Sequence, residues 1–180
     1  RLITDGLIQL LTKLNDKETI VDNINMKMIN YSIINIVSDF MIDYVIDRNI
    51  LHRNIINMNM FSSYEPLIYP GVNIKYFYNT DYNDGICKCT CKCNGKGNGS
   101  GNGNCKRITI AAFMSGSIII TGARNVNQLL EAYNFINNLM TKDKKQMVLK
   151  FKPGDIHQDK YQKLRKDTND NYSEKFIKSE

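Results

Sequence analysis

Hydrophobic positions repeat with helical spacing near both ends of the first 142 residues. Apolar residues at positions 3, 7, 10, 11 and 14 share one helical face and predict a helix over residues 2–14. Further along, Asn125 can cap a helix, with Gln128 three positions later as in a capping box. After Thr141 this pattern fades. We expect the second helix to bury a stripe made of Val126, Leu129, Leu130, Tyr133, Ile136 and Met140.

The pattern between these helices favours short strands. Strands are predicted over residues 26–42, 61–65 and 72–78, and over residues 107–115 and 117–123, which Ser115-Gly116 joins as a tight hairpin. Asp47 offers an N-cap oxygen ahead of Ile50, Leu51 and Ile55, which have helical spacing. The order predicts an α+β fold, an antiparallel curved sheet with helices on one face. The other face would stay open, and we expect the function to lie there.

Residues 79–106 differ from the rest of the chain. A glycine run over residues 94–104 cannot bury a core and predicts a flexible insert within a hairpin. All five cysteines lie between positions 87 and 105, an odd, clustered count that argues against a disulfide scaffold. Clustered thiolates can bind zinc, but structural zinc sites usually have longer spacers and a rigid loop. We therefore favour a tolerated surface insertion over a metal site formed by Cys87, Cys89, Cys91 and Cys93, and we expect no cofactor.

Charge and missing motifs narrow the function classes. The chain has 24 basic and 18 acidic residues, a formal net charge of +6, which permits polyanion binding without requiring it. Much of the excess lies in residues 142–180, expected to be a basic polar tail. The sequence contains no run of eighteen apolar residues, so we expect no membrane span. It also contains no Ser/His/Asp set, phosphate loop or paired-carboxylate motif, so we do not expect an enzyme. The first residue is Arg1, so we expect the chain to be part of a longer protein.

Two stretches carry a resemblance to a known family. One runs Phe61-Ser-Ser-Tyr-Glu-Pro-Leu-Ile-Tyr-Pro-Gly71, and the other runs from Ile108 to Arg124 and contains Phe113-x-Ser-Gly116. With Ile34-Asn-Ile-Val37, in this order and spacing, they resemble the C-terminal repeat of the TATA-box-binding protein family. The resemblance implies that residues 26–141 form half of a saddle, with the insert at 79–106. Residues 1–25 would then end a preceding repeat.

The resemblance also implies a function, that of a general transcription initiation factor which binds AT-rich promoter DNA in the minor groove and bends it. Tyr69 and Phe113 match the family's aromatic wedges, which unstack base steps and kink the duplex. Asn35, which can donate to adenine N3 or thymine O2, and Val37 match groove contacts. If the wedges point to DNA, alternation along the strands places four more residues on the same surface: Thr109, Ala111, Ile119 and Thr121. Lys75 and Arg124 match the family's phosphate contacts.

Departures from the family leave an alternative open, a protein-interaction module of the transcription machinery with weak or no DNA binding. Thr109 and Ala111 replace larger aliphatic residues, and Ser117 replaces a phosphate-binding lysine. The loop with Tyr64, Glu65 and Leu67 matches the docking site for transcription factor IIB, although Leu67 replaces an acidic residue. The implied partners are double-stranded AT-rich promoter DNA, transcription factor IIB-like and IIA-like proteins and the RNA polymerase initiation machinery. The implied location is the nucleus or, alternatively, the viral factory of a large DNA virus.

Overall fold

The computed structural model describes residues 2–16, 32–82, 84–90, 93, 95 and 105–150, which belong to two compact units, Arg1–Ile33 and Ile34–Glu180. The first unit holds α1 (Leu2–Asn15), which confirms the predicted helix. Within α1 the Thr12 hydroxyl donates to the Ile8 carbonyl oxygen over 2.9 Å. Among the described residues, no helix combines the length and the apolar character needed to cross a bilayer.

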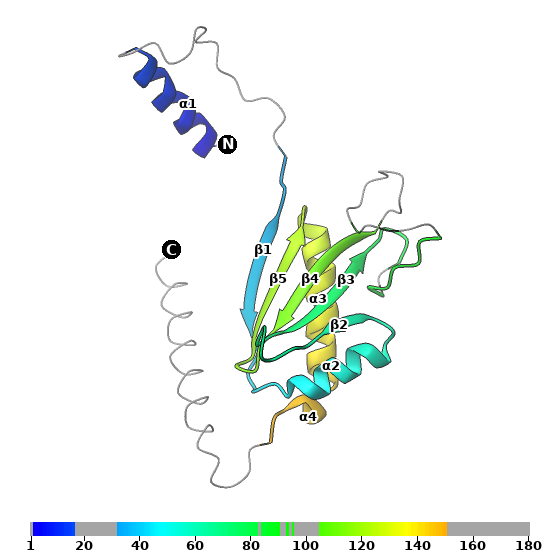
Figure 1. Ribbon diagram of the computed structural model, residues 1–180. Coiled ribbons are helices and arrows are strands. Elements are labelled where there is room, and N and C mark those ends of the chain that lie inside the picture. The colour runs from blue at the N-terminus through cyan, green and yellow to red at the C-terminus, as the bar shows by residue number, and fades with distance from the viewer. Residues whose placement is uncertain are drawn as a thin grey trace. The chain divides into compact units, whose positions relative to one another are not determined.

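The second unit is built on a five-stranded sheet in which every neighbouring pair is antiparallel (Figure 1). The order across the sheet is β1-β5-β4-β3-β2, so β1 and β2 form its edges. The predicted fold class is confirmed. The strands are β1 (Ile36–Met41), β2 (Phe61–Ser63), β3 (Val72–Tyr78), β4 (Lys106–Ala112) and β5 (Ser117–Ala123).

The first strand is shorter than the sequence pattern predicted. Residues 32–35 are not in a strand, because β5 ends at Ala123, the partner of Ile36, and earlier residues have no strand beside them. Residues 26–31 of the prediction lie outside the described residues. At the hairpin, β4 stops at Ala112, so residues 113–115 form the turn instead of extending the strand.

The described residues of this unit form three helices: α2 (Arg48–Asn57), α3 (Val126–Lys142) and α4 (Lys144–Met147). Asp47 caps α2 as predicted, because its carboxylate accepts from the backbone N–H groups of Asn49 and Ile50 at 3.0 and 3.1 Å. Asn125 caps α3 by accepting from the Gln128 N–H at 2.9 Å. The Gln128 side chain accepts from the Arg124 N–H instead of the Asn125 N–H, so the predicted capping box is only half formed.

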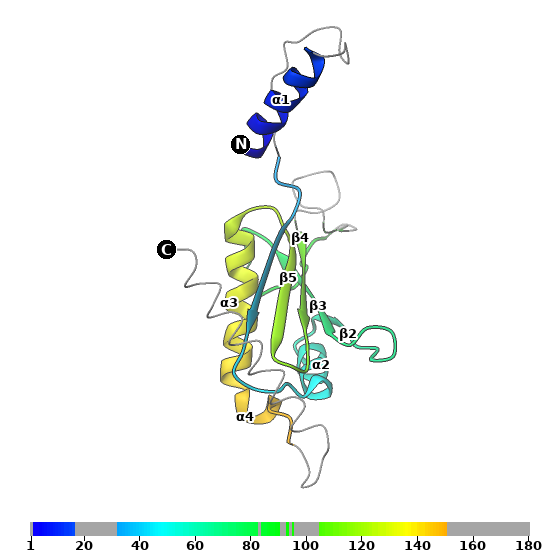
Figure 2. The same cartoon turned by 90° about the vertical axis from the view of Figure 1, so that its left-hand side faces the viewer.

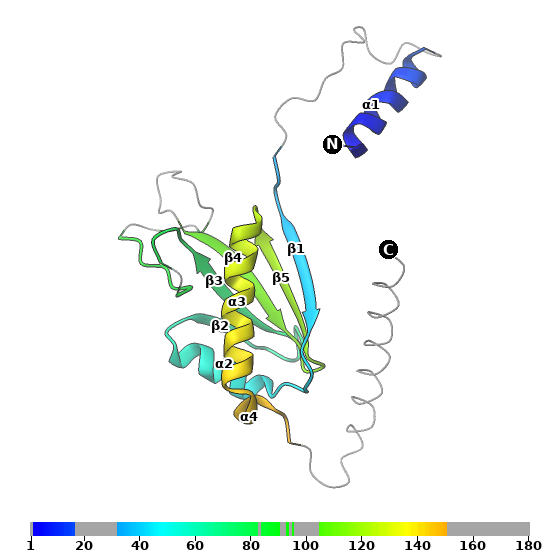
Figure 3. The same cartoon turned by 180° about the vertical axis from the view of Figure 1, so that it is seen from behind.

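The hydrophobic core lies between the sheet and these helices. Alternate residues of the central strands are buried there, and they meet Leu51 and Ile55 of α2 and Ile136 and Met140 of α3. Figure 3 shows α3 running across this side of the sheet, and Figure 2 shows the same helix on one side of the strands. The strands contribute Ile74, Tyr76, Ile108, Ile110, Ala112, Ile118 and Ile120 to this core.

The buried stripe of α3 differs from the predicted one. Ile136 and Met140 are buried, but Val126, Leu130 and Tyr133 are 62%, 49% and 37% exposed. Leu129 packs against the core as expected, and the helix also buries Ala132, whose small side chain allows close approach, and Gln128, whose side-chain oxygen accepts from the Arg124 N–H. A pattern of hydrophobic residues alone predicts neither the burial of a small residue such as Ala132 nor that of a hydrogen-bonded polar residue such as Gln128. The observed buried stripe is Gln128, Ala132, Ile136, Leu139 and Met140.

The folded unit also extends beyond Thr141, where the sequence pattern fades. Met147 in α4 is fully buried, and its carbonyl oxygen accepts from the Asp47 N–H at 2.7 Å. Ile46 forms an antiparallel bridge with Val148, and the Leu149 N–H donates to the Val45 carbonyl oxygen at 2.8 Å. The segment up to residue 150 therefore packs onto the domain, and only residues 151–180 of the predicted tail lie outside the described residues.

Candidate nucleic-acid interface

The sheet face opposite the helices is the candidate interface, here called the open face. Within this unit, no described helix packs against it, and cross-strand pairing sets its composition. Because directly opposed residues share a face, the register defines two rows of side chains across the sheet. The first row is Val37, Thr121, Thr109, Lys75 and Phe61, and the second is Asp39, Ile119, Ala111, Asn73 and Ser63.

The predicted contact residues on the strands all lie on the open face, with unequal exposure. Val37 is 60% exposed, whereas Thr109, Ile119 and Thr121 are half-buried among their neighbours. Ala111 is only 6% exposed, because its single methyl group lies between the larger side chains of Asn73 and Ile119. Ala111 therefore adds little area for a partner.

Asn35 lies just before β1, where its side chain is fixed against β5. Its amide oxygen accepts from the Gly122 N–H at 2.7 Å, and its amide nitrogen donates to the Thr121 hydroxyl at 3.2 Å. A side-chain amide carries two N–H donors, so these bonds leave one donor for a further acceptor. The arrangement is consistent with a groove contact through the nitrogen, while the oxygen is engaged within the sheet.

Tyr69 and Phe113 meet at one end of the open face. Their ring centroids are 5.7 Å apart and the ring planes are inclined by 61°, an edge-to-face pair. Neither residue is in a strand: Tyr69 lies three residues before β3, and Phe113, which was expected within the strand over residues 107–115, begins the turn after β4. The pairing of Val72 with Ala112 still brings the two segments together, and both rings lie outside the buried core.

Two glycines fix the backbone beneath and beside these rings. A Cβ added at Gly71 would lie 2.8 Å from Tyr69 Cε1 and 3.0 Å from Phe113 Cε1, so both rings close over this position. Gly116 has a φ of +96°, and a Cβ there would meet the carbonyl oxygens of Ile42 and Tyr44 at 2.8 Å. Its N–H donates to the Phe113 carbonyl oxygen at 3.0 Å, which closes the turn that presents the Phe113 ring.

Residues 30–142, more than half of the chain, match the family described as transcription factor TFIID, or TATA-binding protein (TBP). The chain belongs to the TATA-binding protein family. A comparison with curated proteins finds no match. The family consists of DNA-binding transcription factors that are nuclear and are not enzymes, and the five-stranded sheet with its helices is one half of the TBP saddle.

Arg48 ties the ring-bearing segments of this TBP domain to α2, and the sequence analysis did not identify it. Its guanidinium donates to the Pro70 carbonyl oxygen, lies 3.7 Å from the Met114 sulfur and stands 5.2 Å from the centroid of the Tyr64 ring. The first residue of α2 thereby joins the loop before β3 to the turn after β4. Local pattern could not reveal this role, because the partners lie 16 to 66 positions away in the chain.

The open face of the TBP domain carries basic side chains on β3 and β4 and a carboxylate on the edge strand β1. Lys75 donates to the Thr109 hydroxyl at 2.9 Å, and burial, together with the charge of Arg107, holds the pKa of Lys75 below its ordinary value. Burial, followed by the charges of Arg124 and Arg107, likewise lowers the pKa of Lys106. By alternation along the strands, Lys75 and Arg107 lie on the open face, whereas Lys106 has the parity of the buried Ile108 and lies on the helical side.

Asp39 is the feature of this face that the sequence analysis missed. It is exposed on β1 directly opposite Ile119, while the next residue, Phe40, packs edge-on against Tyr133 of α3 at a centroid distance of 4.9 Å. Alternation along β1 therefore points the Asp39 carboxylate to the open face. A carboxylate there opposes the approach of a polyanion.

The loop that matches the family's docking site projects from the domain. The N–H groups of Ile68 and Tyr69 donate to the Glu65 carbonyl oxygen at 2.9 and 2.8 Å, which closes a tight turn. Tyr64 is half-buried beneath the Arg48 guanidinium, whereas Leu67 is fully exposed and Ile68 is 85% exposed. The turn thus presents two neighbouring apolar side chains at its tip.

The cysteines of the insert are arranged differently from the expectation. The sulfur atoms of Cys87, Cys89, Cys93 and Cys105 all lie within 4.8 Å of one another, although the sequence analysis argued against a preformed cluster. The set also includes Cys105, the residue before β4, which the sequence analysis did not consider; the expected Cys91 lies outside the described residues. Spacing within the Cys-x-Cys array could not reveal this, since the fourth sulfur comes from beyond the glycine run.

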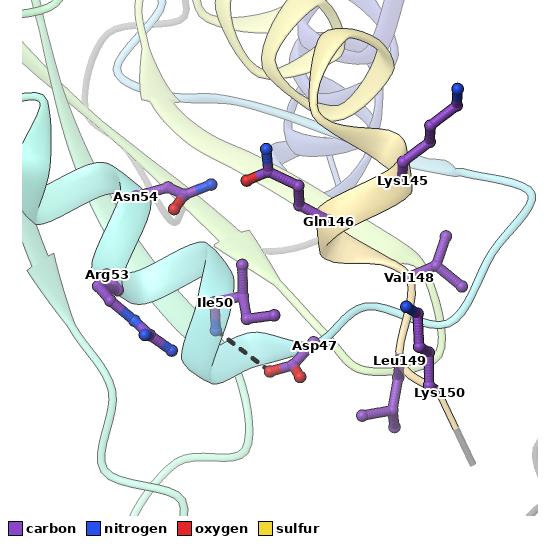
Figure 4. Close-up of a pocket in the computed structure, with 9 residues that line it drawn as sticks. All are labelled: Asp47, Ile50, Arg53, Asn54, Lys145, Gln146, Val148, Leu149 and Lys150. Carbon is purple, nitrogen blue, oxygen red and sulfur yellow. Dashed lines mark hydrogen bonds between the residues drawn. The ribbon is translucent and has the colours of Figure 1, made fainter.

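A surface hollow of about 520 Å³ lies between α2 and α4, away from the open face (Figure 4). Arg53, Lys145 and Lys150 line it together with Asp47, whose carboxylate already caps α2. The hollow is therefore a basic surface feature on the helical side of the domain, and it contributes nothing to the candidate interface.

Proposed function

We propose that this TBP domain binds the minor groove of AT-rich promoter DNA and bends it, with Tyr69 and Phe113 as the wedge. The observation that carries the proposal is the edge-to-face ring pair at the end of the open face, closed over Gly71. Both rings lie outside the buried core, so they can contact a partner without unfolding the domain.

The chemistry of the open face suits an AT-rich groove. A·T and T·A pairs present only acceptors in the minor groove, whereas guanine adds an amino donor. Val37 and Ile119 offer apolar contact, and the Asn35 nitrogen and the hydroxyls of Thr109 and Thr121 offer hydrogen bonds. Inserted rings unstack base steps at a cost of about a few kcal/mol per step, and the resulting bend brings more of the groove onto the sheet. Lys75 and Arg124 would contact phosphates.

The assembly proposed around this complex follows from the projecting loop. Tyr64, Glu65 and Leu67 would contact a transcription factor IIB-like protein, and a transcription factor IIA-like protein and the RNA polymerase initiation machinery would join the complex. Initiation in the nucleus, or in the viral factory of a large DNA virus, is the proposed setting. We also propose that α1 ends a preceding repeat, since Leu7, Leu10 and Leu14 leave an apolar stripe exposed on it.

The proposal predicts a bend that depends on base composition. The full chain should bind an AT-rich duplex about tenfold more tightly than a GC-rich duplex of the same length, equivalent to about 1.4 kcal/mol. Fluorescence energy transfer between dyes at the two DNA ends should rise on binding only for the AT-rich duplex. Equal affinity for both duplexes with no change in transfer would remove the proposal.

Asp39 allows a gain-of-binding prediction. Replacing Asp39 by serine should tighten binding to AT-rich DNA about fivefold, because about 1 kcal/mol of repulsion from nearby phosphates is removed. The affinity should also fall more steeply with salt. Fluorescence anisotropy titrations at several salt concentrations measure both effects.

The matched control for this variant is Asp43→Ser, which changes the net charge by the same amount. Asp43 pairs with Lys144 over 2.7 Å, away from the open face. If Asp43→Ser tightens binding as much as Asp39→Ser, the gain reflects net charge alone and the placement of DNA on the open face is wrong.

A second candidate function is a TBP-fold interaction module with weak DNA binding. The exposed Leu67 and Ile68 favour it, as do the carboxylate of Asp39 and the covered Ala111 on the open face. This function predicts that the chain captures a transcription factor IIB-like protein without DNA and that Leu67→Ser, which removes the exposed apolar side chain without restoring the family's acidic residue, abolishes the capture. Capture that requires DNA would decide against it.

A further inference from the structure

The sulfur cluster beside the β3–β4 hairpin has the dimensions of a metal site. The sulfur atoms of Cys87, Cys89, Cys93 and Cys105 lie within 4.8 Å of one another, and those of Cys89 and Cys105 are 3.3 Å apart. A tetrahedral zinc ion with Zn–S bonds of about 2.3 Å holds its sulfurs about 3.8 Å apart. The observed distances bracket this value, so only small side-chain shifts separate the cluster from such a site.

The backbone around the cluster is anchored to the hairpin on both sides. The Phe77 N–H of β3 donates to the Gly85 carbonyl oxygen at 2.9 Å, shortly before the first ligand. The Arg107 N–H of β4 donates to the Gly95 carbonyl oxygen at 2.7 Å, shortly after the third. Cys105 is fully buried and immediately precedes Lys106, which pairs with Tyr78. The sheet itself therefore positions the segments that carry the four sulfurs.

We propose that Cys87, Cys89, Cys93 and Cys105 bind one zinc ion in a closed structural site. Four thiolates around one centre select a soft or borderline ion and leave no coordination position for a substrate. A multinuclear iron–sulfur cluster fits less well, because its iron and sulfide atoms would separate the cysteine sulfurs further than the structure shows. The Asn79 amide nitrogen donates to the Cys105 sulfur at 3.6 Å, the kind of outer hydrogen bond that orients a ligand.

Two disulfide bonds are the competing arrangement for four neighbouring cysteines. A disulfide brings two sulfurs to about 2.05 Å and gives the two pairs no reason to gather around a common centre. The mutual proximity of all four sulfurs is what a single central ion requires, and it favours zinc. The ion would connect the insert to the residue that precedes β4.

The full chain, purified under reducing and anaerobic conditions, tests the proposal. Elemental analysis should find one zinc per chain. Replacement by cobalt(II) should give thiolate-to-metal charge transfer and the visible bands of a tetrahedral ion. Cys89→Ser and Cys105→Ser should each lose stoichiometric zinc, whereas Cys91→Ser, the matched control in the same array, should keep it.

Several outcomes would overturn the zinc site. The site would be excluded if the wild-type chain took up neither zinc nor cobalt, or if its intact mass showed two disulfides under the same conditions. It would also be excluded if Cys91→Ser lost as much metal as Cys89→Ser. If Cys105→Ser fails to fold, the half-buried Cys89 and the cobalt spectrum of the wild type still decide the question. DNA binding enters none of these measurements, so the zinc site and the proposed function succeed or fail separately.

Discussion

Replacing Tyr69 and Phe113 together by alanine is expected to abolish DNA bending and weaken binding to AT-rich DNA about 100-fold. Each ring that stacks on a base contributes about 1–2 kcal/mol, and the two contributions together give this factor. Without the rings the duplex stays straight and meets less of the open face. Energy transfer between the DNA ends reports the bend, and anisotropy reports the affinity.

The controls for this variant separate the wedge from general loss of aromatic surface. Tyr82→Ala removes a ring of similar exposure, 44% against 38% for Tyr69, from a site that contacts Lys88 instead of Phe113. It should bind and bend DNA as the wild type does. Tyr69→Phe removes only the hydroxyl and should keep or increase the bend. A double variant that bends DNA normally would show that the rings serve only the fold.

Replacing Ile120 by alanine is expected to destabilise the domain by about 2–5 kcal/mol, the usual cost of truncating a fully buried isoleucine. Ile120 is fully buried between β5 and the helices. Its neighbour Ile119 is half-buried on the open face, so Ile119→Ala should cost about 1 kcal/mol or less while weakening binding to AT-rich DNA. Urea unfolding followed by circular dichroism measures stability.

This pair is its own matched control, since both changes are Ile to Ala at consecutive positions of one strand. Equal destabilisation by the two variants would mean that both faces of the sheet are covered. If a folded Ile120→Ala protein lost DNA affinity while Ile119→Ala kept it, the proposal that DNA binds the open face would be wrong.

Short-range patterns predicted most of the sheet and its faces. Alternation along residues 108–112 and 118–121 assigned Thr109 and Ile119 to the face toward DNA; both are only half-buried, whereas their neighbours Ile110 and Ile120 are fully buried in the core. Capping by Asp47 was also predictable, because a carboxylate three residues before the bonded N–H acts within one turn. The pairing of Tyr69 with Phe113 was expected from the motifs, although neither residue lies in a strand.

The failures concern the way elements pack against one another. Hydrophobicity predicted only part of the stripe of α3: Ile136 and Met140 are buried and Leu129 packs against the core, whereas Val126 and Leu130 are exposed and Ala132 and Gln128 take buried positions. Residues 144–150 were assigned to a polar tail, yet Met147 is buried through contacts with the segment before α2. Contacts between distant segments do not produce a repeating pattern of apolar residues, so the sequence pattern could not predict them.

The sequence by itself determined the strands, their buried faces, the helix caps and the family motifs, because each depends on neighbouring residues or on a period of two. Only the tertiary structure decided which distant groups meet: Arg48 with Pro70 and Tyr64, the Asp39 carboxylate on the open face, and Cys105 with the cysteines of the insert. The physical reason is that strand register and helix packing, set by the whole core, bring these groups together across long stretches of chain.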